Sequence, residues 1–430
     1  MKIETSKSFL NGEISIPGSK SHTIRALIAA MLADGESIIK NPLTADDPES
    51  CLFAIKKLGC GFSEEYDENN LLVWKIKGNG GKITNPNDSI IYLGNSGTSL
   101  RLLTGVCATS PLKICFDGDD SLRGRPMGHL ISSLEKLGAK ITSSEGGKCP
   151  LTVKGPIIGG ETTVVGTCSQ FVSSLLFSTP LAKEDTIINV LKVNEKPYID
   201  ITLGWLDFLN IKYQAEPDYS QFKIKGNQKY KPFSVTIPAD FSTASFPLAA
   251  AAITGGKIKI LNIDFTDKQG DKEVFDYLER MGTRINKFSN YANVSGSSQL
   301  LGDIEIDMNN TPDALPIMAV TACFAKGKTI LSNAEHARIK ETDRIKAMKT
   351  ELKKMGADIE EKHDGLIINY SKLHGAVVDG HADHRIIMSL AIAGMASDGV
   401  TQIENASEIS VTYPNFINDF KKLGANIKIL

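Results

Sequence analysis

The chain has 430 residues, of which 41% are hydrophobic and 23% are charged, and its formal net charge is -2. This length exceeds what one compact core usually holds and suits two domains of about 200 residues each. The near-neutral charge excludes the broad positive field of a nucleic-acid-binding protein, so anions must be bound by local groups. Apolar runs all fall short of the roughly 18 residues that span a bilayer. We therefore expect no nucleic-acid partner and no membrane partner.

The N-terminal stretch and the cysteines indicate the compartment. Residues 1–20 lack the apolar core of a signal peptide and the Arg-rich, Ser-rich character of a transit peptide. The seven cysteines are scattered, without a Cys-x-x-Cys pair and without a histidine at zinc-ligand spacing. These features predict a cytoplasmic protein with reduced thiols and no bound metal. Because no coiled-coil or interface pattern is visible, we expect a monomer.

One short phrase recurs six times along the chain. It reads IKKLGCGF, LEKLGAKI, LDFLNIKY, LERMGTRI, LKKMGADI and FKKLGANI, starting at Ile55, Leu134, Leu206, Leu278, Leu352 and Phe420. Two apolar residues end a helix, a Gly or Asn takes the left-handed position after it, and an alternating strand follows. The regular recurrence predicts six copies of one supersecondary unit of about 70 residues.

An apolar helix rich in small residues precedes each phrase. These predicted helices begin near Ser21, Gly97, Cys168, Phe241, Thr311 and His381. Helices with so little polar surface are expected to be buried. The predicted fold is therefore α/β, with three units per domain, buried helices at the centre and sheets outside. The chain is expected to cross between domains near Pro17 and Lys231. Residues 1–17 plus 232–430 would form one discontinuous domain, and 18–231 an inserted one.

Each predicted buried helix is polar at its start. The residues concerned are Lys20, Ser21 and Arg25; Asn95, Gly97, Thr98 and Arg101; Ser169 and Gln170; Asp240, Ser242, Thr243 and Ser245; Asp313; and Asp383, His384 and Arg385. Capping alone would explain any one helix. Six buried helices with this pattern favour an anion site, because helix N-termini offer free N–H groups and positive potential. We expect helices of two domains to bind two anionic ligands, with the fourth helix mainly structural.

Residues 338–344 read RIKETDR, a dense alternation of charges. Within one helix Lys340 and Arg344 would repel each other, so self-stabilisation explains the pattern badly. We expect these two cations one turn apart on a helix face that contacts a ligand. Dinucleotide-binding, Walker, HExxH and GxSxG motifs do not occur in the sequence.

Several motifs together carry a family resemblance. They are PGSKSHTIRAL (17–27), LGNSGTSLRLL (93–103), RPMGHL (125–130), SQFVSSLL (169–176), KPYIDIT (196–202), RIKETDR (338–344) and DHR (383–385). From residue 17 to about 414, the chain resembles the 5-enolpyruvylshikimate-3-phosphate synthase family. The resemblance implies two domains of three βαβαββ repeats each, an inside-out barrel design. It also implies transfer of the enolpyruvyl group of phosphoenolpyruvate to the 5-hydroxyl of shikimate 3-phosphate, releasing phosphate without metal or cofactor.

The resemblance also implies roles for individual residues. Asp313 would be the base, Glu341 the acid that protonates the methylene carbon, and Lys20 a catalytic group touching both substrates. Shikimate 3-phosphate would contact Lys20, Ser21, Arg25, Cys168, Ser169, Gln170, Asp313, His336 and Lys340. Phosphoenolpyruvate would contact Lys20, Asn95, Gly97, Arg125, Gln170, Arg344, His384 and Arg385.

Some positions depart from common family patterns. Cys168 replaces a Ser, His336 replaces an Asn, and Val411 stands where some members have a Lys. Glu195 stands where a phosphate-binding Ser is frequent. Since an acid beside a phosphate is unfavourable, we expect Glu195 to point away and Lys196 to take over.

Three alternatives remain for the function. UDP-N-acetylglucosamine enolpyruvyl transferase shares the architecture but has a loop Cys five residues before the Arg-Pro pair, where this chain has Asp120. A non-catalytic repeat scaffold that binds an anion would not need Lys20, Asp313 and Glu341. An RNA 3′-phosphate cyclase of related design would need a basic surface, which the net charge disfavours.

Overall fold

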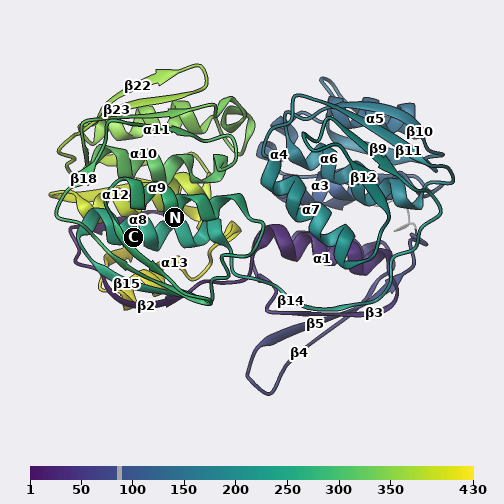
Figure 1. The fold of residues 1–430 in the computed structure, drawn as a ribbon, viewed down its shortest axis with the longest axis horizontal. Coiled ribbons are helices and arrows are strands. Elements are labelled where there is room, and N and C mark those ends of the chain that lie inside the picture. Colours follow the sequence, from purple (N-terminus) through teal and green to yellow (C-terminus); the bar gives the residue numbers. More distant parts are fainter. Residues whose placement is uncertain (85–89) are drawn as a thin grey trace. The chain divides into compact units, whose positions relative to one another are not determined.

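The computed structural model describes residues 1–84 and 90–430, which form two compact units (Figure 1). Unit 1 consists of Met1–Pro17 and Pro238–Leu430, and unit 2 consists of Gly18–Ile237. The second crossing follows Ile237 rather than Lys231, because β14 (Ser234–Thr236) still pairs with β3 (Asp34–Lys40) of unit 2. None of the described helices is long and apolar enough to cross a membrane.

The described part of unit 2 has three four-stranded sheets, of order β14-β3-β5-β4, β6-β7-β9-β8 and β10-β11-β13-β12. Their other strands are β4 (Gly61–Tyr66), β5 (Leu72–Asn79), β6 (Ile90–Tyr92), β7 (Ile114–Asp117), β8 (Lys140–Ser144), β9 (Lys148–Lys154), β10 (Gly160–Val165), β11 (Thr186–Leu191), β12 (Tyr213–Ala215) and β13 (Gln221–Ile224). The inner helices are α1 (Lys20–Leu32), α3 (Gly97–Cys107) and α6 (Ser169–Ser178). The others are α2 (Asp46–Lys57), α4 (Asp120–Gly124), α5 (Gly128–Lys136), η1 (Thr179–Leu181) and α7 (Lys196–Phe208).

Unit 1 repeats this design with sheets β16-β17-β15-β2, β19-β21-β23-β22 and β24-β25-β1-β26, beside a small pair β18-β20. Its strands are β1 (Ile3–Ser6), β2 (Asn11–Ser15), β15 (Lys257–Leu261), β16 (Arg284–Lys287), β17 (Tyr291–Ser295), β18 (Leu300–Leu301), β19 (Ile304–Asp307), β20 (Ala325–Lys326), β21 (Lys328–Ser332), β22 (Asp358–Lys362), β23 (Gly365–Asn369), β24 (Val377–Asp379), β25 (Val400–Glu404) and β26 (Asn426–Ile429). The inner helices are α8 (Phe241–Thr254), α10 (Leu315–Cys323) and α12 (His384–Ala396). The outer ones are α9 (Glu273–Arg280), α11 (Arg344–Lys354) and α13 (Phe416–Lys422), and the short 3-10 helices are η2 (Gly270–Lys272), η3 (Pro312–Ala314), η4 (Glu335–Ile339) and η5 (Ser407–Val411).

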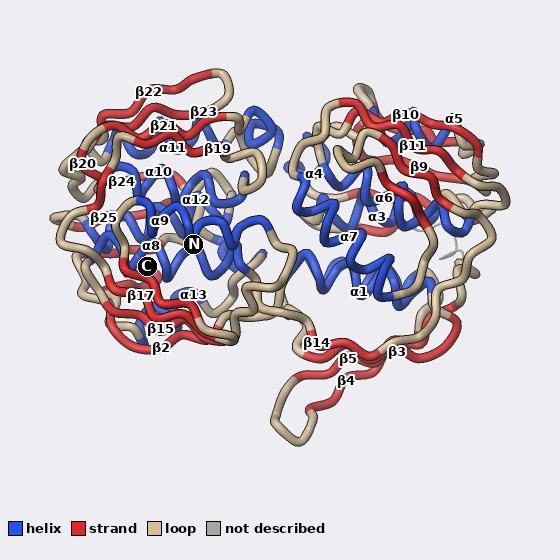
Figure 2. The backbone as a smooth tube through the Cα atoms, viewed as in Figure 1, coloured by secondary structure: helices blue, strands red, loops and turns tan. Residues whose placement is uncertain are grey.

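All six four-stranded sheets share one pairing order, a parallel pair extended by two antiparallel strands. Within each unit the strands lie outside and the helices inside (Figure 2). Every residue of α3 is buried, and so are nearly all residues of α8 and α12. This confirms the predicted α/β fold with buried helices and outer sheets.

The recurring phrase ends one outer helix in each of the six repeats, namely α2, α5, α7, α9, α11 and α13. The residue in its left-handed position has positive φ in all six copies: Gly59, Gly138, Asn210, Gly282, Gly356 and Gly424. Glycine and asparagine adopt this conformation at the lowest cost, which explains why the phrase needs them there. The turn then directs the chain into the outer strand.

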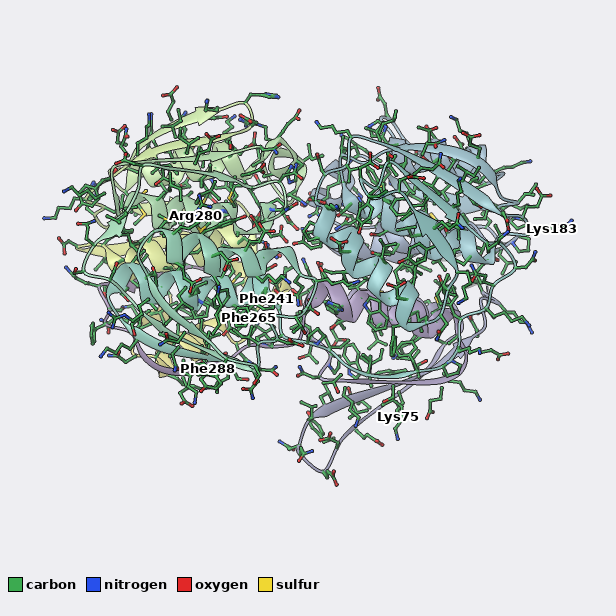
Figure 3. All side chains as sticks on the ribbon, in the orientation of Figure 1. Lys75, Lys183, Phe241, Phe265, Arg280 and Phe288 are labelled. Carbon is green, nitrogen blue, oxygen red and sulfur yellow. The ribbon has the colours of Figure 1, made fainter. Side chains whose placement is uncertain are left out.

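Aromatic packing fixes the start of α8 in unit 1. The rings of Phe241 and Phe265 lie 5.6 Å apart between centroids (Figure 3). Phe275 of α9 contacts both rings edge-on, at 5.9 Å from Phe241 and 5.1 Å from Phe265. Such pairs add to the burial of apolar area, so this cluster holds the segment before α9 against the polar start of α8.

Candidate active site

In unit 2 the first helix begins with a lysine held by an acid. The N-cap Ser19 accepts a hydrogen bond from the His22 backbone, and Lys20 is the first residue of α1. Lys20 Nζ lies 3.1 Å from Asp47 Oδ2, and both side chains are largely buried. Sequence reasoning missed Asp47, because an acid near the start of an outer helix is also ordinary capping chemistry.

Arg25 is a buried cation of unit 2, with 1% of its surface exposed. Its guanidinium donates to Thr202 Oγ1 at 2.9 Å, Ser173 Oγ at 3.4 Å, and the carbonyls of Ser21 at 3.0 Å and Tyr198 at 3.1 Å. All these acceptors are neutral, and no carboxylate of the described chain pairs with Arg25. Burial lowers its pKa to about 10. A buried charge without a counter-charge is costly, so this site favours an anionic ligand.

The start of α6 carries a carboxylate where we expected none. Ser169 donates to Glu195 Oε2 through its backbone N–H at 3.0 Å and through Oγ at 2.7 Å. The expectation that Glu195 points away is therefore wrong, since a helix N-terminus stabilises a carboxylate. Lys196 is exposed and lies over the ring of Tyr219, so it does not replace a serine there. Cys168, the N-cap residue, makes no side-chain capping bond.

A loop and α3 position Arg125 of the predicted phosphoenolpyruvate set. Arg125 Nη2 donates to Asn95 Oδ1, and to Ser121 Oγ at 3.2 Å. Asn95 also donates to Asp119 Oδ2 at 3.1 Å, which fixes the orientation of its amide. A Cβ at Gly97 would lie 2.7 Å from Arg125 Nη1, so the guanidinium would have to shift if any other residue stood there.

A second arginine of α3 orients Gln170. Arg101 Nη1 donates to Gln170 Oε1, and Gln170 Nε2 donates to Thr98 Oγ1 at 2.8 Å. The Arg101 guanidinium also lies 5.3 Å from the ring centroid of Phe171. Arg101 and Thr98 appeared in the sequence only as polar helix-start residues, and their contacts add them to the candidate site as partners of Gln170.

In unit 1 three acids surround one buried arginine. Arg344 is 1% exposed and donates to Asp313 Oδ1 at 2.7 Å, Glu341 Oε2 at 2.6 Å and Asp383 Oδ2 at 2.8 Å. Arg385 Nη2 donates to the other oxygen of Asp313 at 2.8 Å. Burial alone would lower the pKa of Arg344, but the neighbouring carboxylates outweigh it and raise the pKa well above its ordinary value. The arginine is therefore permanently charged.

Asp343 and Asp383 are the N-cap residues of the two helices that carry these arginines. Asp383 Oδ1 accepts from the backbone of Arg385 at 2.8 Å and caps α12. Asp343 Oδ1 accepts from the backbone of Lys346 at 3.0 Å, so α11 begins only at Arg344. Lys340 lies between η4 and this cap, outside α11. The expectation that Lys340 and Arg344 share one helix face is therefore wrong. The cap ends the regular structure between them.

The remaining predicted residues of unit 1 are two buried histidines and a half-buried lysine. His336 lies in η4 and His384 begins α12, both buried. Lys340 is half-buried. Val411, at the position where some family members have a Lys, is a buried apolar residue of η5.

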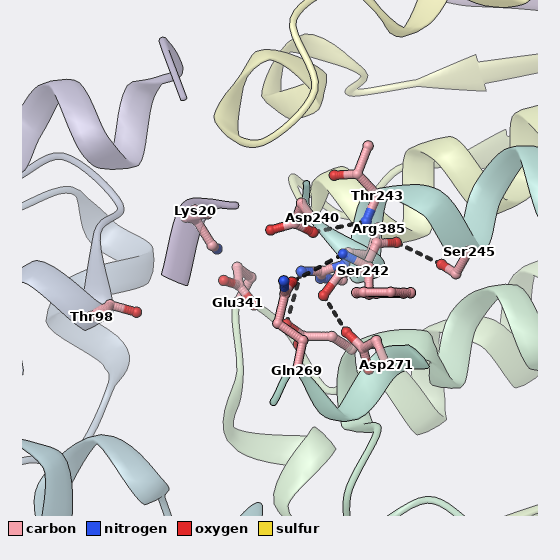
Figure 4. Close-up of polar contacts among 12 residues, drawn as sticks. Lys20, Thr98, Asp240, Ser242, Thr243, Ser245, Gln269, Asp271, Glu341 and Arg385 are labelled. Carbon is pink, nitrogen blue, oxygen red and sulfur yellow. Dashed lines mark hydrogen bonds and ion pairs between the residues drawn. The ribbon is translucent and has the colours of Figure 1, made fainter. Parts of the chain in front are cut away.

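A buried acid that sequence reasoning missed lies beneath the start of α8. Ser242 donates to Asp271 Oδ2, while Asp240 caps the helix by accepting from the Thr243 backbone at 2.8 Å (Figure 4). Burial and the charge of Asp313 raise the pKa of Asp271 to about 7, against the lowering effects of Arg385 and Ser242. The fourth repeat, which we expected to be mainly structural, thus adds a titratable group next to the arginine cluster.

Comparison with known proteins identifies the family. The model of the EPSP synthase (3-phosphoshikimate 1-carboxyvinyltransferase) family matches residues 5–420. A protein of that name from Acetivibrio thermocellus is 46% identical over 428 residues, 99% of both chains. Another, from Methanocaldococcus jannaschii, is 42% identical over 426 residues, 98% of this chain and 97% of its own. The solved EPSP synthase of Acinetobacter baumannii covers 100% of both chains, with a TM-score of 0.82 and 25% identity.

The fold and the arginine-rich helix starts define an enolpyruvyl transferase. The chain belongs to the EPSP synthase family, and its activity is the enolpyruvyl transfer of the shikimate pathway to aromatic amino acids. The alternative acceptor, UDP-N-acetylglucosamine, and the non-catalytic scaffold are not supported by these matches.

Proposed function

We propose that the chain transfers the enolpyruvyl group of phosphoenolpyruvate to the 5-hydroxyl of shikimate 3-phosphate, with Asp313 as base and Glu341 as acid. The hydroxyl oxygen bonds to C2 of phosphoenolpyruvate while its proton passes to Asp313. Glu341 gives a proton to C3, which becomes a methyl group. In the second half, C3 returns a proton, the bond from C2 to the phosphate oxygen breaks, and phosphate leaves.

The arginine contacts explain how Asp313 could become a base. A carboxylate between two guanidinium groups is a weak base, because both cations favour its ionised form. Phosphoenolpyruvate brings a carboxylate and a phosphate that would compete for Arg344 and Arg385. Once those arginines turn to the ligand, Asp313 loses their stabilisation and its affinity for the proton rises.

The same exchange would prepare Glu341. Its carboxylate lies 2.6 Å from Arg344 Nη2, and a guanidinium at that distance favours the ionised form of an acid. A ligand anion that takes over Arg344 would free Glu341 to carry a proton. One binding event thus supports both proton transfers, and Arg344 is the residue that joins them.

The observation that carries the acceptor assignment is Arg25, fully buried and lacking an acidic partner among the described residues. We assign the phosphate of shikimate 3-phosphate to Arg25 and Ser169. The proposed set for this substrate is completed by Lys20, Ser21, Cys168, Gln170, Asp313, His336 and Lys340. The proposed set for phosphoenolpyruvate is Lys20, Asn95, Gly97, Arg125, Gln170, Arg344, His384 and Arg385.

The proposal includes a cytoplasmic monomer. All seven cysteines are free thiols, and all except Cys115 are buried, which suits a reducing compartment. Light scattering of the purified protein is expected to give the mass of one chain, 46.5 kDa. A value of twice that mass would contradict the monomer.

Isotope labelling tests the proposed reaction. In heavy water, the methyl intermediate would take one deuteron at C3 and lose any of its three hydrogens afterwards. The enolpyruvyl product formed from shikimate 3-phosphate should therefore carry deuterium in its methylene group, as read by mass spectrometry. A product without deuterium would contradict addition followed by elimination.

A further inference from the structure

We propose that Glu195 occupies the place of the substrate phosphate at the start of α6, and that shikimate 3-phosphate must displace its carboxylate to bind. This inference rests on the proposed function, because it takes Ser169 and Arg25 as phosphate ligands. It makes Glu195 a residue that sets the affinity and the selectivity of the acceptor site.

The contacts of Glu195 are those that a phosphate oxygen would make. One oxygen, Oε2, accepts from both the backbone N–H and the hydroxyl of Ser169, the first residue of α6. The residue is 1% exposed, so this contact is made away from solvent. Free N–H groups at a helix start bind phosphates and carboxylates by the same interaction. The two anions would therefore exclude each other at this position.

The backbone shows that Glu195 is held in this place. Its φ is +55°, a left-handed conformation that few residues other than glycine adopt. It directly precedes α7, and its carboxylate contacts Ser169 at the start of α6. Such a conformation persists where surrounding contacts determine it, and here the bond to Ser169 is such a contact.

A second feature of the same site points to a ligand with more charge than Glu195. Arg25 bonds Ser173, one turn beyond Ser169 in α6, and Tyr198, three residues after Glu195 in α7. No carboxylate of the described chain, Glu195 included, lies within ion-pair distance of it. Glu195 therefore satisfies Ser169 but leaves the buried cation unbalanced.

A phosphate monoester could satisfy both groups at once. It carries a charge of about -1.5 to -2 and three acceptor oxygens, against a single charge on a carboxylate. It can bond Ser169 with one oxygen and Arg25 with another, which gives it the advantage over Glu195. A ligand without the phosphate has no group to displace the carboxylate. Glu195 thus lowers the affinity for shikimate 3-phosphate and rejects unphosphorylated shikimate.

Calorimetric titration of shikimate 3-phosphate into the full chain tests this. Glu195→Ser and Glu195→Gln remove the competing charge, and Glu135→Gln removes an equivalent charge from the exposed face of α5 in the same unit. We expect both Glu195 variants to bind at least about tenfold more tightly than the parent protein, a change in binding free energy of about 1.4 kcal/mol. The Glu135 variant should bind like the parent. Equal or weaker binding by the Glu195 variants would overturn the inference.

Thermal unfolding gives a second readout that does not depend on the titration. Without ligand, Glu195→Ser should melt lower than the parent, because α6 loses a capping group. Saturating shikimate 3-phosphate should raise its Tm by more than it raises the parent's Tm. An equal or smaller increase would contradict displacement. If shikimate 3-phosphate bound neither the parent nor the variants, the proposed function would be wrong. Equal binding by all of them would contradict only the role of Glu195.

Discussion

Asp313 and Arg344 form an ion pair of 2.7 Å inside unit 1, and the second oxygen of Asp313 is held by Arg385. The acid proposed as base is thus bound by two cations that we assign to phosphoenolpyruvate. Competition for these arginines links ligand binding to proton transfer.

Replacing the proposed base should stop turnover and spare binding. Asp313→Asn keeps an oxygen that can accept from Arg344 but cannot take the substrate proton. We expect kcat to fall by about 10²- to 10⁴-fold, the usual contribution of a general base. Phosphate release measures kcat, and calorimetry should find the affinity for shikimate 3-phosphate within a few-fold of the parent. Undiminished turnover would remove Asp313 from the base role.

The buried ion cluster should be important for folding as well as for binding. Arg344→Met would leave the buried Asp383 without the guanidinium that pairs with it, while Asp313 would keep only Arg385. Breaking a buried pair in this way costs about 3–5 kcal/mol of unfolding free energy. Urea unfolding measures the loss. Lys2→Met, which breaks the exposed pair with Glu404, is the control and should leave the midpoint unchanged. Equal behaviour of the two variants would contradict the cluster's role.

Replacing Arg25 should have the opposite effect on the unfolding free energy. Its neighbours remain bonded without it, since Ser173 and Thr202 share a hydrogen bond of 2.8 Å and Thr202 also donates to the Tyr198 carbonyl at 3.1 Å. Arg25→Met should therefore leave the ligand-free protein as stable or more stable, because an unbalanced buried charge is removed. The same variant should lose detectable binding of shikimate 3-phosphate. A strong loss of stability with binding retained would refute the assignment of Arg25 to the ligand.

The raised pKa of Asp271 predicts a pH dependence of stability. Asp271 is protonated in the folded protein up to about pH 7 but ionises near its ordinary value of 3.8 when unfolded. The folded state thus binds the extra proton between these values, and its stability falls as pH rises through that range. Asp271→Asn removes this dependence and keeps an acceptor for Ser242.

Unfolding free energies of the parent and of Asp271→Asn, measured from pH 4.5 to 7.5, test this directly. The unfolding free energy of the variant minus that of the parent should increase as pH rises, by up to about 1.4 kcal/mol per pH unit. The charged groups facing Asp271 are Asp313, Arg385 and Asp240, and they are the same in both proteins. A difference that stays constant over the range would show that Asp271 is ionised throughout.

A methyl group at Gly97 should displace Arg125. Gly97→Ala would place a carbon 2.7 Å from Arg125 Nη1 and 3.3 Å from Arg101 Nη1. Arg125 must then move, so the KM for phosphoenolpyruvate should rise while the affinity for shikimate 3-phosphate changes little. Gly128→Ala, at a position where an added methyl meets open space, serves as the matched control. An unchanged KM in the Gly97 variant would separate Arg125 from phosphoenolpyruvate.

Local patterns made most of the fold predictable from the sequence. Six left-handed Gly or Asn residues and six small-residue helices follow from rules that act within a few residues. The segment 338–344 shows the limit of such reasoning. Its charges suggested one helix face, but Asp343 is an N-cap, and an Asp at that position could have signalled the helix start at Arg344.

Contacts between distant segments could not be predicted in the same way. The bond from Ser169 to Glu195 joins two helices that only the packed unit brings together. Repulsion between an acid and a phosphate predicts that Glu195 points away from a phosphate site, yet the start of α6 attracts its carboxylate. Asp271 was missed for a related reason: its raised pKa depends on burial and on Asp313, neither of which its local sequence shows.

Phosphate release from phosphoenolpyruvate by the purified protein of 430 residues shows which acceptor the enzyme uses. With shikimate 3-phosphate as acceptor, we expect one phosphate per enolpyruvyl ether formed, and no release with shikimate or UDP-N-acetylglucosamine. No release with shikimate 3-phosphate, or release only with UDP-N-acetylglucosamine, would contradict the account.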